Sequence, residues 1–272
     1  MDNQEKMKYV MIIGAMKAGT TSLFHYLADH PHICPAVTKE PEFFSENQGH
    51  ARKFDKYEDC FRPNYKMHSY CLDASTGYTK YPSERNVPKS IFEYGIKPKF
   101  IYVLRNPIKR IESQYNFMQK YDKPWSYNDN LSYLLDLSKY AMQLDQYMHF
   151  FKREDVLLLD FEELKIAPQS VLKKVYTFLE LDFYNSNKIN KQYNKTRKET
   201  LKADRYKKKV DARFAAFPKI FRDVLKFLIS KKYRIKPMIL NESQKNNIYL
   251  ALREDIERLK KVYNFSTSHW KL

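Results

Sequence analysis

The chain has 272 residues, of which 43% are hydrophobic, and a formal net charge of +17. This length suits one large α/β domain over residues 1–272, and the charge favours an anionic partner such as a nucleotide, an acidic glycan, a membrane surface or nucleic acid. Cys34, Cys60 and Cys71 are odd in number and form no C-x-x-C pair, which argues against a disulfide framework or a zinc site.

The N-terminal segment Met1–Lys8 is polar. The apolar run after it is too short, and too soon followed by Lys17, for a signal peptide or a membrane span. We therefore expect a cytoplasmic protein with reduced thiols.

The apolar run Tyr9–Gly14 predicts a buried strand, and the segment Gly14–Ser22 (GAMKAGTTS) predicts a turn that opens a helix over Thr20–His30. Backbone N–H groups of such a turn and of the helix N-terminus together form a phosphate site. The glycine spacing matches the start of a P-loop, but Thr20 stands where nucleoside triphosphatases have lysine. Because the lysine lies three positions earlier, at Lys17, we interpret this loop as a site for a different phosphate donor.

Further apolar runs predict strands, and helical periodicity fills the segments between them: the strands are Tyr70–Ala74, Lys99–Leu104 and Val156–Phe161, and the helices are Pro107–Tyr121, Leu131–Lys152 and Pro168–Leu179. This alternation predicts a three-layer α/β/α fold with a central parallel sheet. Ligands bind beyond the carboxyl ends of the strands in such sheets. We therefore expect Gly14–Thr21, Asp73–Thr76 and Arg105–Asn106 to converge on one crevice.

The run FIYVLRNPIKRIES, which starts at Phe100, places Arg105 at the end of a strand and Ser113 on the helix that follows. Asn106 suits the N-cap of that helix and Pro107 suits its first position. The planar fork of Arg105 fits a phosphate, and a serine hydroxyl adds a donor. The position of Arg105 is equally compatible with an ion pair to a surface carboxylate.

The segment Lys39–Phe44 (KEPEFF) brings carboxylates close behind the first helix. Glu40, next to the stiff Pro41, can act as a general base towards a bound acceptor hydroxyl. A merely solvated Glu40 is the simpler alternative, and His32 and His68 are the other candidate bases.

Together these segments resemble the sulfotransferase family that uses 3′-phosphoadenosine 5′-phosphosulfate (PAPS). Gly14–Thr21 resembles its 5′-phosphosulfate loop, and Val103–Pro107 with Ser113 resembles its 3′-phosphate motif. Lys39–Phe44 is similar to the base-bearing segment of the branch that includes heparan sulfate sulfotransferases. The likeness runs in order along nearly the whole chain and continues in Asp73–Tyr78, Asp160–Leu164, Lys195–Arg197 and Ser268–Trp270.

The resemblance implies roles for individual residues. Lys17 would neutralise the bridging oxygen of the donor, Arg105 and Ser113 would bind the 3′-phosphate, and Glu40 would take the proton of the acceptor. No metal is required in this scheme. The implied cofactor-binding set is Lys17, Ala18, Gly19, Thr20, Thr21, Ser22, Arg105, Ser113, Arg197 and Arg234.

Two departures from the family pattern limit this transfer of roles. Ala74 stands where the heparan sulfate enzymes have a lysine, so no lysine role is carried over there. The segment Lys232–Pro237, which supplies Arg234, lacks the glycine of the Lys-Gly-Arg phosphate loop that it would replace.

The segment 197–236 holds 15 Lys/Arg and 4 Asp/Glu, and residues 214–232 within it form an amphipathic pattern. Such a helix either packs on the domain with its lysines in water or rests on an anionic membrane at the inner face. A charged helix is expected over Asn241–Tyr263.

The resemblance favours a carbohydrate or glycolipid hydroxyl as acceptor, with an amine as second choice. Trp125, Tyr115, Tyr121 and Tyr127 are candidates for lining an acceptor cleft. The alternative functions are a P-loop small-molecule kinase and a nucleic-acid-binding protein that uses residues 197–236.

Overall fold

The computed structural model describes residues 7–47, 54–121, 126–189, 191, 193 and 200–270. Its described strands form a parallel sheet in the order β2-β3-β1-β4-β5. Their bounds are β1 Lys8–Gly14, β2 Ile33–Pro35, β3 Tyr70–Asp73, β4 Lys99–Leu104 and β5 Val156–Asp160. The predicted strands are confirmed to within one residue at their ends. The edge strand β2 escaped prediction because three residues are too few to show a period.

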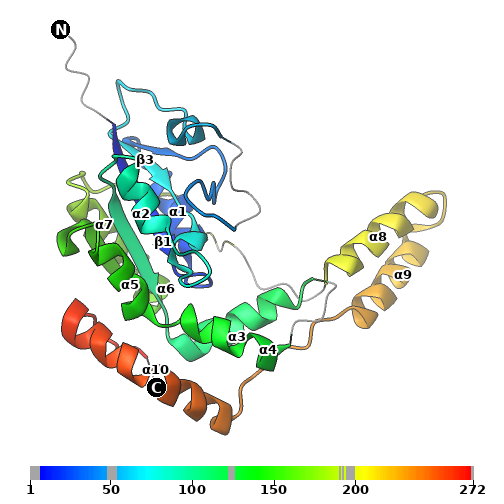
Figure 1. Ribbon diagram of the computed structural model, residues 1–272. Helices are drawn as coiled ribbons and strands as arrows, with labels where there is room; N and C mark the ends of the chain where they lie inside the picture. Colours follow the sequence, from blue (N-terminus) through cyan, green and yellow to red (C-terminus); the bar gives the residue numbers. More distant parts are fainter. Residues whose placement is uncertain are drawn as a thin grey trace.

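Helices flank the sheet, as the predicted fold class requires (Figure 1). The α-helices are α1 Thr20–Leu27, α2 Val87–Glu93, α3 Pro107–Met118, α4 Tyr127–Asp136, α5 Tyr140–Met148, α6 Phe161–Ile166, α7 Pro168–Phe178, α8 Leu201–Arg213, α9 Lys219–Lys232 and α10 Glu242–Tyr263. Short 3-10 helices lie at Tyr57–Cys60, Thr76–Thr79 and Arg153–Asp155. No helix in the described part of the chain has both the length and the apolar composition that crossing a bilayer demands.

Strand order explains why distant loops meet. The central strand β1 lies between β3 and β4, with Met11 opposite Asp73 and Gly14 opposite Tyr102. The interior of β1 and nearly all of β4 are fully buried, as expected for strands covered on both faces. The carboxyl ends of these neighbouring strands therefore open onto the same edge of the sheet.

The prediction of one helix over Leu131–Lys152 is wrong, because the chain breaks between α4 and α5. The buried guanidinium of Arg110 donates to the carbonyl of Leu134 (2.7 Å) and to the hydroxyl of Ser138 (2.7 and 2.9 Å), which holds the break in place. Asp255 of α10 accepts hydrogen bonds from two N–H groups in the first turn of α5 (3.0 and 2.8 Å). This capping by a distant carboxylate stabilises a second helix start.

Helix α10 confirms the predicted C-terminal helix, and Asn241 is its N-cap in a capping box with Gln244. It packs against α3 and α4 through an apolar cluster that contains Ile111, Leu134 and Leu252. After α10 the chain returns to the main core, where Trp270 is buried beside Tyr140 (5.8 Å between ring centroids).

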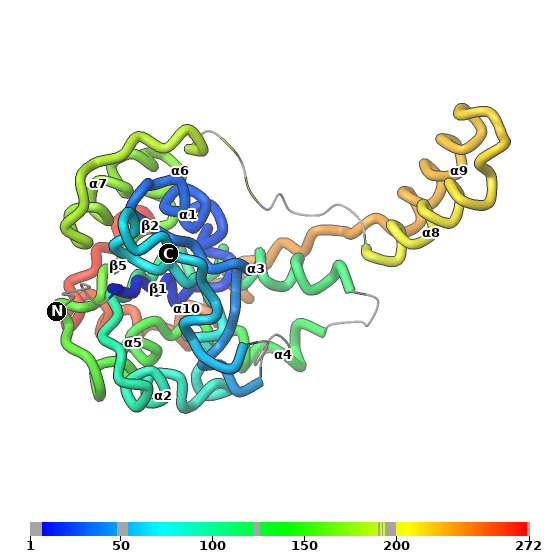
Figure 2. The backbone as a smooth tube through the Cα atoms, turned by 90° about the horizontal axis from the view of Figure 1, so that it is seen from above, coloured from blue at the N-terminus to red at the C-terminus, as the bar shows by residue number. Residues whose placement is uncertain are grey.

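Helices α8 and α9 form an antiparallel hairpin that projects away from the body of the protein (Figures 1 and 2). Of the two alternatives for the amphipathic segment 214–232, packing on the rest of the domain is therefore wrong: the partner of α9 is α8, and no residue of α9 is buried by the described part of the chain.

Gly14 is the point where β1 turns into the loop, and its backbone has φ +155°. A Cβ there would lie 2.1 Å from Oγ1 of Thr79, which donates to the Ile13 carbonyl (2.8 Å). We expect Gly14→Ala to lower the free energy of unfolding by about 2–4 kcal/mol through collision and backbone strain. Urea denaturation measures this loss.

Gly95→Ala is the matched control, since Gly95 also has a positive φ (+83°) but no atom lies within 4 Å of its added Cβ among the described residues. It should cost about 1 kcal/mol. Equal losses in the two variants would contradict the role assigned to the contact with Thr79.

Candidate active site

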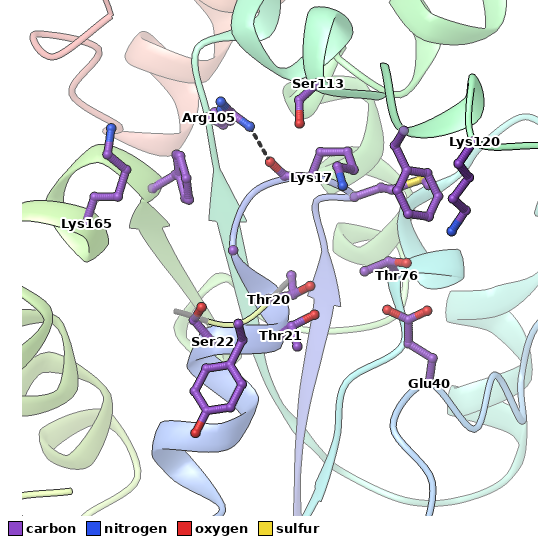
Figure 3. A pocket seen from close by; sticks show the side chains of 15 residues that line it. Lys17, Thr20, Thr21, Ser22, Glu40, Thr76, Arg105, Ser113, Lys120 and Lys165 are labelled. Carbon is purple, nitrogen blue, oxygen red and sulfur yellow. Dashed lines mark hydrogen bonds between the residues drawn. The ribbon is translucent and has the colours of Figure 1, made fainter. Parts of the chain in front are cut away.

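A cavity of about 650 Å³ opens where the loops after β1 and β4 meet the 3-10 helix after β3. Figure 3 shows Arg105 and Lys165 towards one end of the cavity, Glu40 and Lys120 towards the other, and Lys17 between them. The predicted convergence of the strand ends is thereby confirmed. The lining residues are Met16, Lys17, Gly19, Thr20, Thr21, Ser22, Glu40, Thr76, Arg105, Ser113, Phe117, Lys120, Phe161, Lys165 and Tyr193.

The loop after β1 adopts a conformation that exposes the start of α1. Gly19 is the N-cap of α1 with φ +82°, and a Cβ there would lie 2.9 Å from the ring of Phe161. The N–H groups in the first turn of a helix have no partner within the helix and point towards an anion at its N-terminus. Ala18 differs from its predicted neighbours, because its N–H donates to the Ala15 carbonyl (3.0 Å) and its side chain is buried away from the cavity.

The Lys17 side chain enters the cavity from a left-handed backbone (φ +72°). Its Nζ lies 4.2 Å from the centroid of the Phe117 ring. Burial, and after it the neighbouring charges of Lys120 and Arg105, lower the pKa of Lys17 to about 8, against the raising effect of Glu40. A lysine amine with a pKa near 8 responds strongly to a bound anion.

Arg105 joins the loop after β4 to the loop after β1. Its Nη1 donates to the carbonyl of Lys17 (2.7 Å), and its guanidinium lies 4.6 Å from the centroid of the Phe161 ring. Its Nε is buried and lacks a hydrogen-bond partner among the described residues. Because a buried unsatisfied donor is costly, this atom points to a ligand that supplies an acceptor.

The helix that carries Ser113 begins as predicted. The Asn106 side chain accepts from the N–H of Lys109 (3.1 Å), and Pro107 occupies the first position of α3. Ser113, Phe117 and Lys120 recur at i, i+4 and i+7, so they face the same cavity.

Glu40 lines the end of the cavity opposite Arg105 and is 37% exposed at its side chain, so solvent and an acceptor can reach it. It forms an ion pair with Lys39. The backbone is left-handed at Glu40 (φ +61°) and at Glu42 (φ +51°), which turns the segment sharply around Pro41. Such a conformation persists only where surrounding contacts fix it.

A buried polar network supplies those contacts. The carboxylate of Glu42 accepts from the N–H of Gly77 (2.9 Å) and from the Ser45 hydroxyl (2.7 Å). Ser75 accepts from the N–H of Glu42 (3.0 Å) and donates to Asp73 (2.7 Å), which β3 presents at its end. Burial raises the pKa of Asp73 to about 7 and also raises the pKa of Glu42. The network ties this sharply turned segment to the end of the sheet.

Sequence reasoning missed several lining residues. Phe161 and Lys165 lie one turn apart on α6, and Tyr193 stacks on His25 of α1 (4.1 Å between ring centroids). Helical spacing from Ser113 was the signal that could have found the lining residues of α3. With these additions the lining contains four basic side chains and one carboxylate, which favours an anionic ligand.

Other predicted residues lie elsewhere. Arg234 is exposed beyond the end of α9 and does not line the described cavity. His32 and His68 are also outside the lining, with hydrogen bonds to Met67 and Asn64. Arg197 falls outside the described residues, as does Trp125.

Of the tyrosines proposed for an acceptor cleft, Tyr115 and Tyr127 pack against each other (6.2 Å between ring centroids) and do not line the described cavity. Tyr121 lines a separate hollow at the base of α8, together with Arg205 and Lys208.

A family model described as "Sulfotransferase domain" matches residues 8–219, a range that includes every described residue lining the cavity. The chain belongs to the sulfotransferase domain family. The crystal structure of a sulfotransferase from Alicyclobacillus acidocaldarius superposes with a TM-score of 0.69 at 19% identity, covering 98% of this chain and 100% of that one. The two proteins share the sulfotransferase fold.

Two human members of the family illustrate the sequence similarity. Bifunctional heparan sulfate N-deacetylase/N-sulfotransferase 3 is 28% identical over 199 residues, which cover 64% of this chain and 22% of that protein. Heparan sulfate glucosamine 3-O-sulfotransferase 3A1 is 27% identical over 212 residues, which cover 72% of this chain and 50% of that protein. This sulfotransferase-family chain thus spans between a fifth and a half of the length of these relatives.

The lowered pKa of Lys17 predicts a pH-dependent affinity for adenosine 3′,5′-bisphosphate. Below pH 8 the lysine is already charged, whereas above pH 8 binding of the anion must be accompanied by proton uptake. The affinity should therefore fall as pH rises through about 8, approaching about tenfold per pH unit. Calorimetry in buffers of different ionisation enthalpy measures both the affinity and the proton uptake.

Lys17→Arg is the control, because arginine stays charged over this range. Its affinity should show no step near pH 8. An unchanged step in Lys17→Arg would assign the titration to another group.

Proposed function

We propose that this chain transfers a sulfuryl group from PAPS to a hydroxyl of a carbohydrate or glycolipid acceptor. The observation that carries the proposal is that Lys17, Arg105 and Glu40, from three separate segments, line one cavity. Membership of the sulfotransferase domain family supports the same reaction class.

The described residues suit a donor with two separated anionic groups. PAPS would supply the activated sulfuryl group on its 5′-phosphate, and its 3′-phosphate distinguishes it from ATP. The start of α1, with Thr20, Thr21 and Ser22, would hold the 5′-phosphosulfate. Arg105 and Ser113 would hold the 3′-phosphate, and the unpartnered Nε of Arg105 would gain an acceptor.

The chain's own groups would then stabilise the charge on the leaving group and accept the proton of the acceptor. Lys17 and the N–H groups at the start of α1 stabilise the negative charge that develops on the leaving phosphate oxygen. Glu40 accepts the proton of the acceptor hydroxyl as the new oxygen–sulfur bond forms and the old one breaks. Holding both partners in line supplies much of the remaining rate enhancement.

The acceptor assignment rests on the relatives and on the open end of the cavity. The human relatives carry heparan sulfate in their names, and both N- and O-sulfotransferases occur among them. At the Glu40 end, Lys120 adds a positive charge beside the aromatic Phe117, a combination suited to an acidic sugar. A hydroxyl acceptor is preferred because Glu40 supplies the base that a hydroxyl needs. A glycolipid acceptor would bring the protein to the cytoplasmic face of the membrane.

Arg105→Ala should weaken the binding of adenosine 3′,5′-bisphosphate by about 10- to 100-fold, because a charge-assisted contact to the 3′-phosphate is lost. Adenosine 5′-monophosphate, which lacks that phosphate, should lose much less affinity, only the part that follows from breaking the hydrogen bond between Arg105 and the Lys17 carbonyl. Calorimetry with both nucleotides, and with ATP and Mg²⁺, tests this. Equal losses for both adenylates would place Arg105 in loop support, and preferred binding of ATP with Mg²⁺ would favour a kinase.

Lys17→Ala and Glu40→Gln should each lower sulfuryl transfer by roughly 10²- to 10³-fold. Glu40→Gln should keep full affinity for the bisphosphate, whereas Lys17→Ala should lose part of it. The assay incubates the chain with PAPS and a panel of glycans and glycolipids bearing hydroxyls or free amines. Mass spectrometry then detects the gain of one SO₃.

Glu46→Gln is the control for the general effect of removing one carboxylate from this part of the chain. Glu46 is exposed and lies outside the cavity lining, so its replacement should leave transfer unchanged. Normal turnover by Glu40→Gln would refute the role of Glu40 as base.

A further inference from the structure

Helix α9 carries an uncovered apolar stripe. Its members recur at three- and four-residue spacing and continue from the turn before α9, and each is between 42% and 79% exposed: Phe217, Ile220, Phe221, Val224, Phe227 and Leu228. The spacing puts them on one face of the helix. An exposed contiguous patch of large apolar side chains marks an interaction surface.

The contact with α8 covers this stripe only at the turn, where Phe214 at the end of α8 packs against Phe217 and Phe221 (5.4 and 5.8 Å between ring centroids). Leu225 and Ile229 of α9 are half-buried, and Asp211 of α8 forms ion pairs with Arg222 (3.7 Å) and Lys226 (2.5 Å). The face of α9 that meets α8 is thus a separate one from the apolar stripe. The hairpin projects from the body, so the described part of the body does not cover the stripe either (Figures 1 and 2).

The charge of the hairpin selects among possible partners. Residues 201–232, here called the basic hairpin, contain eleven Lys/Arg and three Asp. Exposed basic side chains border the stripe at both ends of α9, with Arg213 and Lys219 at the turn and Lys231 and Lys232 at the base. A second copy of the hairpin would meet like charge. A nucleic acid would contact the basic side chains but would leave the apolar stripe uncovered.

We infer that the basic hairpin docks on an anionic membrane and inserts the apolar stripe of α9 at the boundary between headgroups and acyl chains. Apolar insertion combined with basic residues at the rim is how amphipathic helices bind anionic bilayers. Each basic residue near such a surface strengthens binding roughly fivefold.

The base of the hairpin is hydrogen-bonded to a residue that lines the cavity. The N–H of Leu201, at the start of α8, donates to the carbonyl of Lys120 (2.8 Å), and Lys120 lines the cavity. Membrane docking would therefore hold the Glu40 and Lys120 end of the cavity in a fixed relation to the bilayer. The docking itself does not depend on the proposed reaction.

The test is co-sedimentation of the full chain with vesicles of phosphatidylcholine alone and with vesicles that contain about 30% phosphatidylglycerol. Binding to the anionic vesicles should be at least tenfold tighter, and high salt should weaken it. The double variant Ile220→Ser with Phe227→Ser should lose at least tenfold in affinity. The matched control, Leu250→Ser with Val262→Ser, removes similarly exposed apolar side chains from α10 and should bind as the parent does.

A second measurement separates insertion from adsorption. Brominated lipids should quench the fluorescence of Phe227→Trp beyond that of the parent chain, and should not do so for Leu250→Trp.

Absence of binding to anionic vesicles at low salt, equal binding by the Ile220→Ser/Phe227→Ser variant, or binding without quenching of Phe227→Trp would each overturn the inference. So would a self-association or oligonucleotide complex that the double variant abolishes while vesicles are not bound. Transfer to a soluble acceptor should be unaffected by the double variant, so failure of the proposed reaction and failure of docking give different results.

Discussion

The hydrogen bond from Arg105 to the carbonyl of Lys17 joins the two loops on which the cavity depends. It forms because β1 and β4 are neighbours in a parallel sheet, so their carboxyl ends lie at one edge. The same contact accompanies the left-handed backbone of Lys17, which sends its amine over the ring of Phe117. The Lys17 amine, the N-terminus of α1 and the Arg105 guanidinium, whose Nε has no hydrogen-bond partner in the described part of the chain, therefore lie at the same cavity.

Buried hydrogen bonds fix the opposite end of the cavity. The segment around Glu40 contains two left-handed non-glycine residues, which are unfavourable by themselves. Asp73, Ser75 and Glu42 hold it through buried hydrogen bonds. Burial of these carboxyl groups is tolerable because their oxygens are hydrogen-bonded. The network therefore gives the accessible carboxylate of Glu40 a rigid segment, opposite the positive charges of Lys17 and Arg105.

The basic hairpin differs from the body in the exposure of its apolar side chains. The body covers most of its apolar residues, whereas α9 keeps a row of large apolar side chains in contact with solvent. The hairpin starts at Leu201, which is hydrogen-bonded to Lys120, so the position of the hairpin is linked to that of the cavity. A membrane would supply the missing cover for α9 and a source of glycolipid acceptors for the cavity.

Residues close together in the chain were enough to predict the longer strands, the start of α3 at Asn106 and Pro107, and the turn after β1, because periodicity and hydrogen bonds within one element specify them. Packing between distant segments fixed the rest. It ended α4 and began α5 through Arg110 and Asp255, brought Lys165 of α6 to the cavity, and left the apolar face of α9 uncovered. Sequence periodicity predicts which face of a helix is apolar, but the partner that covers this face depends on contacts between elements far apart in the chain.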